Sequence, residues 1–491
     1  MGLSPSTFRI LVVGFVALGS TTYGYSSSII ATTLGQPSFL SYFQLDTRVN
    51  ATQLEGAING LFQAGGLVGC LSCIASADSL GRKMAILIAS LVTVVGGALQ
   101  AGSVHIAMYL AFRFITGIGV GALVTLVPLY QSEISPPKIR GFLVGIHGVM
   151  ICIGYTLASW VGLGFYFVNA SGSQWRLPLA IQCLPPLILS CGIFLLPESP
   201  RWLIDNDRAE DALKCFEAIH AESDQSIAQD HDAILAEFNL LQALIVHERQ
   251  EKHTFADLFR YPAMRKRCLI GFFVLFACQG TATLVINNYG PSLYAALGFD
   301  TVPQLLIQSG WITVCPIGNF INSLIVDKVG RTRLLMAGFV GTVSALIGEC
   351  IALSIYQKEG SRSAASAAVF FLFFHIGCFS VTCDATSYIY ASEIFPTPVR
   401  AKGLAISVSG LFVATIIFLQ CAPTAFAEIG WKYYVVFISC TVISFFIVWL
   451  FCPETSQRSL ESIPELFGDS VEPANIKPVA ETRESIGYDE K

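Results

Sequence analysis

Three charged signatures occur twice in this chain, once in each half, and each follows a long uncharged stretch. The pairs are Asp78 to Lys83 with Asp327 to Arg331, Glu133 to Arg140 with Glu393 to Arg400, and Pro197 to Arg201 with Pro453 to Arg458. A chain that repeats its charges roughly 250 residues later is built from two parallel halves, as the two bundles of membrane carriers are.

The composition agrees with a chain surrounded by lipid. Of the 491 residues, 53% are hydrophobic and 13% are charged, and the mean hydropathy is +0.62. Stretches without Asp, Glu, Lys or Arg, such as 10–45, 141–175 and 268–299, exceed the roughly 20 residues that a helix needs to cross a bilayer. We predict an all-α membrane protein with twelve transmembrane helices in two pseudo-symmetric six-helix bundles.

The boundaries of this arrangement follow from the charge pattern. We expect an N-terminal bundle over 1–197, a linker with short amphipathic helices over 198–267, a C-terminal bundle over 268–452 and a mostly disordered tail over 453–491. The last two spans are predicted near 403–427 and 431–452.

Charge asymmetry predicts the orientation. If both termini are cytoplasmic, most Lys and Arg residues lie on the cytoplasmic side. The glycosylation sequons at Asn50 and Asn169 then fall outside. Chance placement of both sequons is the alternative. We expect a multi-pass plasma membrane glycoprotein that acts as a monomer.

Other classes have little support in the sequence. The first apolar stretch lacks a cleavage site after a short core, so we expect a retained span and not a signal peptide. The 15 Cys are scattered and mostly intramembrane, which favours apolar packing over disulfides or zinc. We expect no enzyme activity, no cofactor, no metal and no nucleic-acid partner; the expected partners are a small molecule and the lipid bilayer.

The repeated signatures, together with Arg113 to Gly121 and Val127 to Glu133, resemble the sugar porter family of the major facilitator superfamily. The first outer loop, Thr33 to Phe39, resembles fungal members in particular. The resemblance implies a central site that is exposed alternately to each side of the membrane.

Acidic and basic groups at the cytoplasmic ends of the bundles are the expected gate, since they can pair when that side is closed and separate when it opens. The gate residues are Asp78, Arg82, Glu133, Arg140, Glu198, Arg201, Asp327, Arg331, Glu393, Arg400 and Glu454. The alternative is that these charges only set the topology.

The expected solute site departs from the family pattern. Proton symporters of the family carry Gly-Tyr-Asp in the first span, whereas this chain has Gly24-Tyr25-Ser26, and the sugar-binding Gln of the fifth span is replaced by Gly148 beside His147. Because Ser26 cannot accept the coupling proton, downhill transport is the simpler inference. The intramembrane Arg113 remains a functional candidate, and pairing with backbone carbonyls is its alternative role.

A polar stripe is still expected in the cavity. Gln279, Thr283 and Asn287 follow each other at four-residue steps, just before an expected helix break at Gly290-Pro291. In the tenth span Asp384 is a possible replacement coupling acid or a partner for Arg113, and a locally bonded acid is the alternative. The candidate solute-binding residues are Ser26, Arg113, His147, Gln279, Thr283, Asn287, Asn288, Tyr289, Asp384, Tyr388 and Phe412.

The function that fits these residues is transport of a small polyhydroxylated solute, a sugar, polyol or related compound, by alternating access. Two alternatives stay open. One is an exporter of a less polar secondary metabolite on the same fold, and the other is a non-transporting nutrient receptor.

Overall fold

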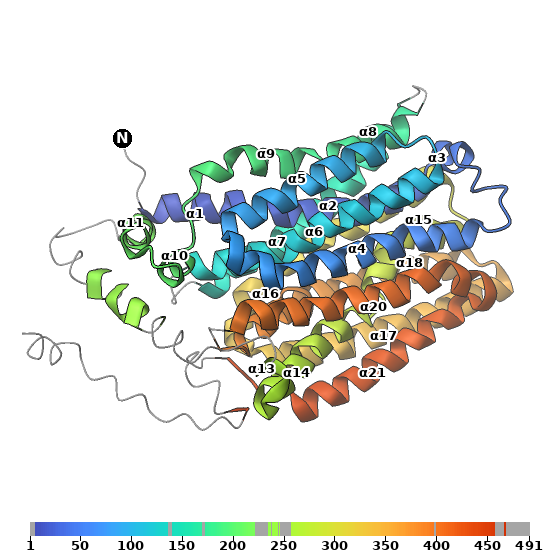
Figure 1. Ribbon diagram of the computed structural model, residues 1–491. Coiled ribbons are helices and arrows are strands. Elements are labelled where there is room, and N and C mark those ends of the chain that lie inside the picture. The colour runs from blue at the N-terminus through green and yellow to red at the C-terminus, as the bar shows by residue number, and fades with distance from the viewer. Residues whose placement is uncertain are drawn as a thin grey trace, which may run out of the picture.

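The computed structural model describes residues 5–135, 140–168, 172–220, 234–236, 238–243, 245, 257–396, 399–456 and 466–467. Within these ranges the chain is helical and contains no strand (Figure 1). The N-terminal half consists of α1 (Pro5–Val16), α2 (Leu18–Leu34), α3 (Pro37–Tyr42), α4 (Ala51–Leu80), α5 (Arg82–Ala101), α6 (Ile106–Ile134), α7 (Arg140–Tyr166), α8 (Ser173–Ile181) and α9 (Leu184–Gly192). The C-terminal half consists of α14 (Pro262–Gln279), α15 (Thr283–Ala296), α16 (Thr301–Val329), α17 (Arg331–Glu359), α18 (Arg362–Thr382), α19 (Asp384–Glu393), α20 (Arg400–Ile429) and α21 (Tyr433–Phe451).

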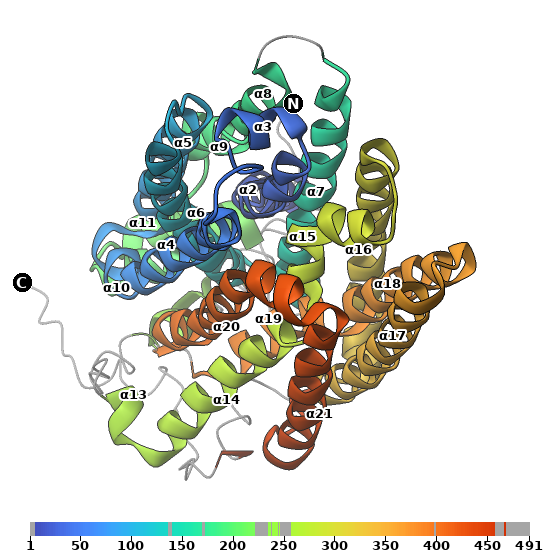
Figure 2. The ribbon, with the colours of Figure 1, turned by 90° about the vertical axis from the view of Figure 1, so that its right-hand side faces the viewer.

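The predicted twelve-helix membrane fold is confirmed. Eleven helical runs in the described residues are long and apolar enough to span a bilayer, and the last run, Arg400–Phe451, contains both α20 and α21. The chain reverses between these two helices at a short 3-10 turn, Gly430–Lys432, where Gly430 has a φ of 55°. Figure 2 shows the two halves side by side, with α2 to α9 in one group and α14 to α21 in the other.

Small residues set the spacing between helices. Gly117 and Gly121 lie four residues apart on α6, and a Cβ on either would collide with the backbone of α4; Gly119, on another face, sits against Thr93 of α5. Close backbone approach of this kind is how transmembrane helices gain packing energy when lipid is as apolar as Leu. The alternating glycines of the Arg113 to Gly121 motif therefore fix α6 between two neighbours.

The expected break at Gly290-Pro291 is wrong. Helix α15 continues through Pro291. A proline has no N–H to donate to the carbonyl four residues earlier, which for Pro291 is the Asn287 carbonyl. The Gln308 side chain of α16 donates to this carbonyl instead, at 3.0 Å.

The break lies upstream, over Gly280 to Ala282, where Ala282 adopts a left-handed φ of 74°. Two carbonyls that the break frees find partners within the C-terminal half. Thr441 Oγ1 donates to Gly280 O at 3.3 Å, and the His375 ring lies 2.7 Å from Thr281 O. A second break, at Cys383, separates α18 from α19.

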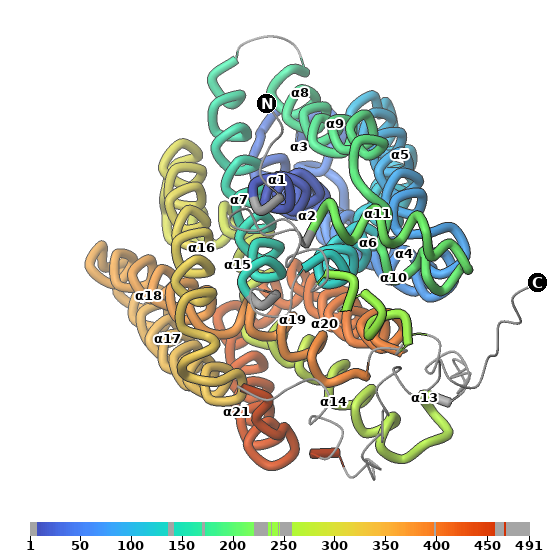
Figure 3. Tube along the Cα trace, turned by 90° about the vertical axis from the view of Figure 1, so that its left-hand side faces the viewer, coloured from blue at the N-terminus to red at the C-terminus, as the bar shows by residue number. Residues whose placement is uncertain are grey.

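Short helices after the N-terminal half cover one end of the molecule. They are α10 (Pro200–Asp205), α11 (Ala209–His220) and α13 (Asp257–Arg260), and Figure 3 shows this end. Leu203 and Phe216 pack with Phe238 and Ile245 in a small apolar cluster. Of the tail predicted to be mostly disordered, 453–491, only 453–456 and 466–467 are among the described residues.

Candidate functional site

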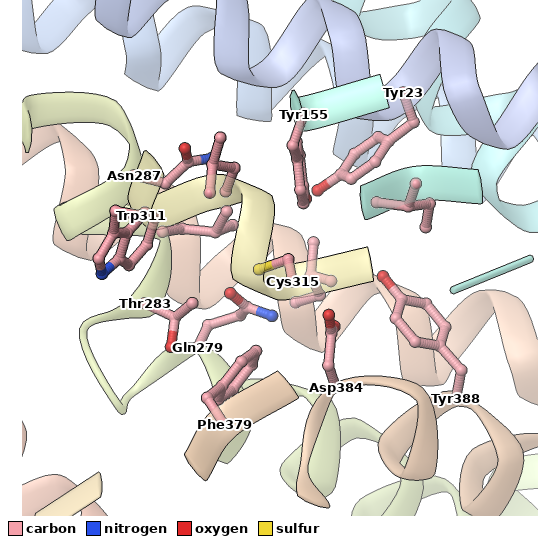
Figure 4. A pocket seen from close by; sticks show the side chains of 14 residues that line it. Tyr23, Tyr155, Gln279, Thr283, Asn287, Trp311, Cys315, Phe379, Asp384 and Tyr388 are labelled. Atoms are coloured by element: carbon pink, nitrogen blue, oxygen red, sulfur yellow. The ribbon is translucent and has the colours of Figure 1, made fainter. Parts of the chain in front are cut away.

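A small cavity of about 20 Å³ lies between the two halves (Figure 4). The N-terminal half contributes Tyr23 of α2 and Ile151 and Tyr155 of α7. The C-terminal half contributes Gln279, Thr283, Leu284, Asn287, Trp311, Ile312, Cys315, Phe379, Asp384, Tyr388 and Leu411. A volume of this size holds about one water molecule. The helices must therefore separate before an organic solute can enter.

The polar wall of the cavity comes from the broken seventh span. Gln279 ends α14 and Thr283 begins α15, so the break at Gly280 to Ala282 places both beside Asn287 on one wall. Gln279 Oε1 and Asn287 Nδ2 are buried without a hydrogen-bond partner. Buried polar groups of this kind are costly unless a ligand or water satisfies them. The wall offers one acceptor and one donor to a bound solute.

Asp384 sits at the first position of α19 and lines the same cavity. Its Oδ2 accepts a hydrogen bond from Asn319 Nδ2 at 2.8 Å and a weak one from the Cys152 thiol at 3.4 Å. The amino end of a helix stabilises negative charge, and amide and thiol donors add to this effect. The surroundings of Asp384 thus provide hydrogen bonds and a favourable dipole, and no ion pair to it is seen among the described residues.

Aromatic rings form the facing wall. Figure 4 shows Tyr23 and Tyr155 reaching the cavity from the N-terminal half, opposite Asp384. Their ring centroids are 6.4 Å apart, and the Tyr23 hydroxyl is buried without a partner. The cavity therefore pairs an aromatic face with a hydrogen-bonding face.

Five of the predicted solute-binding residues line this cavity, namely Gln279, Thr283, Asn287, Asp384 and Tyr388. The other six are not part of its lining, and one of them, Tyr289, lines a different cavity. These six are Ser26, Arg113, His147, Asn288, Tyr289 and Phe412.

Three of the polar residues outside the lining make side-chain contacts of their own, whereas the Ser26 hydroxyl is buried without a partner. His147 Nδ1 lies 2.7 Å from Ser20 Oγ, and its ring meets Tyr388 edge-on. Asn288 donates to the Leu284 carbonyl in its own helix. The Tyr289 hydroxyl accepts from Asn59 and donates to the Leu419 carbonyl.

Arg113 is fully buried in the N-terminal half. Its Nη1 donates to the Ser26 carbonyl at 2.8 Å, and its guanidinium lies 4.1 Å from the centroid of the Phe62 ring. No contact between Arg113 and Asp384 is found among the described residues, so the alternative role as a carbonyl partner describes the observed geometry.

Sequence reasoning missed several cavity residues. Tyr23 and Tyr155 form the aromatic wall, and Trp311 adds a ring on the side of the C-terminal half. Asn319 and Cys152 donate to Asp384 from outside the lining. Tyr23 directly precedes the Gly24-Tyr25-Ser26 triplet, so the sequence did contain a signal that could have identified it. A lone Asn on α16 gives no periodic signal.

The charged signatures meet at one end of the helices, which we call the charged end. In the N-terminal half, Arg82 donates to both carboxylate oxygens of Glu133 at 2.9 Å and contacts Asp78 at 3.4 Å. Glu198 accepts from the backbone amide of Lys83 at the start of α5. Burial raises the pKa of the Glu198 carboxyl, against the opposing effect of the Ser199 and Lys83 amides.

The C-terminal half repeats this geometry. Arg331 forms a two-pronged pair with Glu393, at 2.8 and 3.1 Å, and contacts Asp327 at 2.7 Å. Glu454 accepts from the amides of Arg331 and Thr332 at the start of α17. Burial alone raises the pKa of Glu454, but hydrogen bonds from Thr332 and the backbone amides outweigh it, so the pKa lies below its ordinary value.

These ion pairs join helices of the same half. Between the halves, Lys402 Nζ of α20 lies 4.0 Å from Asp78 Oδ2 of α4. Arg201 and Arg400 start α10 and α20 near this end, and the side chain of Arg140 falls outside the described residues. Among the gate contacts given above for the described residues, those internal to one half therefore predominate.

The whole chain has known relatives. A family model described as "Sugar (and other) transporter" matches residues 12–467. The MFS-type transporter criB of Aspergillus cristatus is 35% identical over 96% of this chain and 95% of its own length. The quinate permease of Neurospora africana is 29% identical over 95% of this chain and 90% of its own. The low-affinity glucose transporter HXT3 of Saccharomyces cerevisiae is 27% identical, over 93% and 82%.

The fold has solved counterparts as well. The proton:xylose symporter XylE bound to 6-bromo-6-deoxy-D-glucose superposes with a TM-score of 0.80 at 22% identity, covering 94% of this chain and 100% of that chain.

Proposed function

The chain belongs to the sugar transporter family of the major facilitator superfamily and is a multi-pass membrane transporter, and from this premise we propose that it moves a small, uncharged, polyhydroxylated solute by alternating access, without coupling to a proton gradient. The observation that carries the proposal is the central cavity, with its aromatic face opposite the unpaired groups of Gln279 and Asn287.

A ring-shaped polyol fits these two faces. Its hydroxyls can donate to Gln279 Oε1 and accept from Asn287 Nδ2, while its C–H face lies against Tyr23 or Tyr155. A site built to hydrogen-bond hydroxyls rejects analogues that lack them, because its own groups are then left unpaired.

Asp384 counts against an anionic solute. A solute carboxylate about 6 Å from Asp384 would be repelled by about 3 kcal/mol at an effective dielectric constant near 20. Quinate, named for relatives of this chain, carries such a group and is expected to be a poor substrate.

Downhill transport rests on the first span. Ser26 has no titratable group, its hydroxyl is buried without a partner, and its carbonyl is already bonded to Arg113. Neither the hydroxyl nor the carbonyl of Ser26 can take up a proton to couple its movement to that of the solute.

The test is counterflow in proteoliposomes. Vesicles loaded with unlabelled glucose, xylose, glycerol or mannitol are placed in the labelled compound, and saturable uptake is expected for at least one of them. Asn287→Ala should lower that uptake by at least about tenfold, whereas Ser344→Ala, a change at an exposed hydroxyl of α17, should not. Absence of saturable flux across the panel would count against the proposal.

A second candidate is proton coupling through Asp384, which the cavity geometry favours because this carboxylate lies at the solute site. If a protonophore strongly lowers uptake into an energised host, and Asp384→Asn removes that sensitivity, coupling replaces the downhill mechanism. If uptake is unchanged by the protonophore, downhill transport stands.

We further propose a plasma membrane location with both termini cytoplasmic. Asn50 is exposed at the end opposite the charged end, directly before α4, and Asn169 lies outside the described residues. Loss of a glycan-dependent gel shift in Asn50→Gln would support an outside position for this end; modification of an engineered sequon in the loop before α13 would reverse the orientation.

A further inference from the structure

A second and much larger cavity, about 230 Å³, lies away from the solute site. It shares no lining residue with the central cavity and sits at the end opposite the charged end. Its walls come from the first turns of α4 and from α15, α17, α20 and α21. Figure 2 looks onto this end of the molecule. A space of this size accommodates a small organic molecule, because apolar cavities of about 150 Å³ already bind benzene.

One oxygen of a buried acid in this cavity has no hydrogen-bond partner among the described residues. Glu349 of α17 is only 2% exposed, and its Oε2 makes no hydrogen bond. The hydroxyl of Tyr434, 1% exposed and on the opposite helix α21, is likewise unpartnered. A buried carboxylate without a countercharge is strongly unfavourable, so this position is suited to a group that brings a positive charge or a donated hydrogen bond.

The remaining lining points to the kind of molecule. Glu55 of α4 adds a second carboxylate, and the lining contains no Lys, Arg or His. Phe426, Trp431 and Tyr434 supply aromatic surface, on which cations bind favourably. We propose that this cavity binds a small organic cation, a protonated amine on an apolar or aromatic body, with the ammonium group at Glu349.

The cavity spans both halves of the transporter. Thr52 and Glu55 belong to the N-terminal half, and the other lining residues belong to the C-terminal half. Alternating access moves one half against the other, so an occupant has different affinities for the two states and shifts their populations. The amine would therefore inhibit transport from a site separate from the solute.

The experiment measures binding to the purified full-length protein by its melting temperature. The probes are benzylammonium and benzyl alcohol, which have nearly the same shape and differ in charge. We expect the amine to raise the melting temperature in a saturable way and the alcohol to have little effect. Glu349→Gln should weaken amine binding by at least about tenfold, because it removes the charged partner.

A matched control is Glu428→Gln, which alters an exposed carboxylate on α20 at the same end and should leave amine binding unchanged. If Glu349→Gln does not fold, Trp431→Leu provides a second test and should weaken the amine several-fold.

Equal stabilisation by amine and alcohol, equal affinity in Glu349→Gln and the unmodified chain, or no stabilisation by the amine would each overturn the proposal. Because binding is measured without any transported solute, this result is independent of whether the proposed solute class is correct.

Discussion

Arg113 links two helices of the N-terminal half and does not line the cavity. Arg113→Ala would remove the hydrogen bond from the guanidinium to the Ser26 carbonyl, and a hydrogen bond to a charged group is worth about 1.5–3 kcal/mol. We expect transport to fall at least about tenfold and the melting temperature to fall with it. Arg333→Ala, at an exposed position, is the control. Lost transport with an unchanged melting temperature would instead indicate direct contact with the solute.

At the scale of residues, the sequence correctly predicted cavity-lining residues where they follow a helical spacing. The four-residue spacing of Gln279, Thr283 and Asn287 placed all three on one wall, although the helix between the first two is broken. Asn319 escaped prediction because its importance comes from Asp384, a residue on another helix. Long-range contacts of this kind leave no local signature.

The turns between paired helices require glycine. Gly330, between α16 and α17, has a φ of 102°, and a Cβ there would lie 2.7 Å from Glu454 Oε2. Gly330→Ala therefore adds a collision to backbone strain of about 1 kcal/mol. Gly360→Ala is a matched control, because Gly360 has a φ of 63° but nothing within 4 Å. The melting temperature should fall further in Gly330→Ala; equal losses would mean that Glu454 moves aside freely.

The cap of α17 predicts a pH effect. The pKa of Glu454 is lowered in the folded protein, so its contribution to stability is present above the ordinary pKa, near 4.5, and is lost as the pH falls through the lowered value. The pKa of Glu198 is raised in the folded protein, so its effect on stability has the opposite pH dependence: it favours the folded state more at low pH.

Melting curves recorded between neutral and acidic pH test this difference. Glu454→Gln should flatten the loss of stability below about pH 4.5, whereas Glu198→Gln should steepen it. The same slope in all three proteins would contradict the assignment.

At the scale of helices, the sequence predicted which segments form helices better than it predicted where those helices are interrupted. The apolar stretches gave the twelve helices, yet the predicted break at Pro291 was misplaced, since Gln308 supplies the hydrogen bond that the proline removes. A proline is visible in the sequence, but a compensating donor on the next helix is not.

Over the whole molecule, the ion pairs of the charged end mostly stay within one half, so motion of the halves leaves them intact. Lys402 and Asp78 do face each other across the halves. A surface pair of this kind is worth about 0–1 kcal/mol. Lys402→Glu should therefore shift the population toward the state open at the charged end by up to about fivefold.

Cysteine accessibility at the charged end, measured in Lys402→Glu, checks this shift. Arg333→Glu reverses an exposed charge at the same end on α17 and should cause little change. Equal accessibility in both variants would remove Lys402 from the gate.

The interrupted seventh span divides its two pieces between different neighbours. Within the interruption, Gly280 and Thr281 are bonded to Thr441 and His375 of the C-terminal half; beyond it, Asn287 is bonded both to Gln308 of the same half and to Ser28 of the other half. Ala282 lies between, in a backbone geometry that alanine disfavours. Separation of the two halves at this end therefore has to break the hydrogen bond between Ser28 and Asn287, whereas the bonds of Gly280 and Thr281 lie within one half and do not have to change.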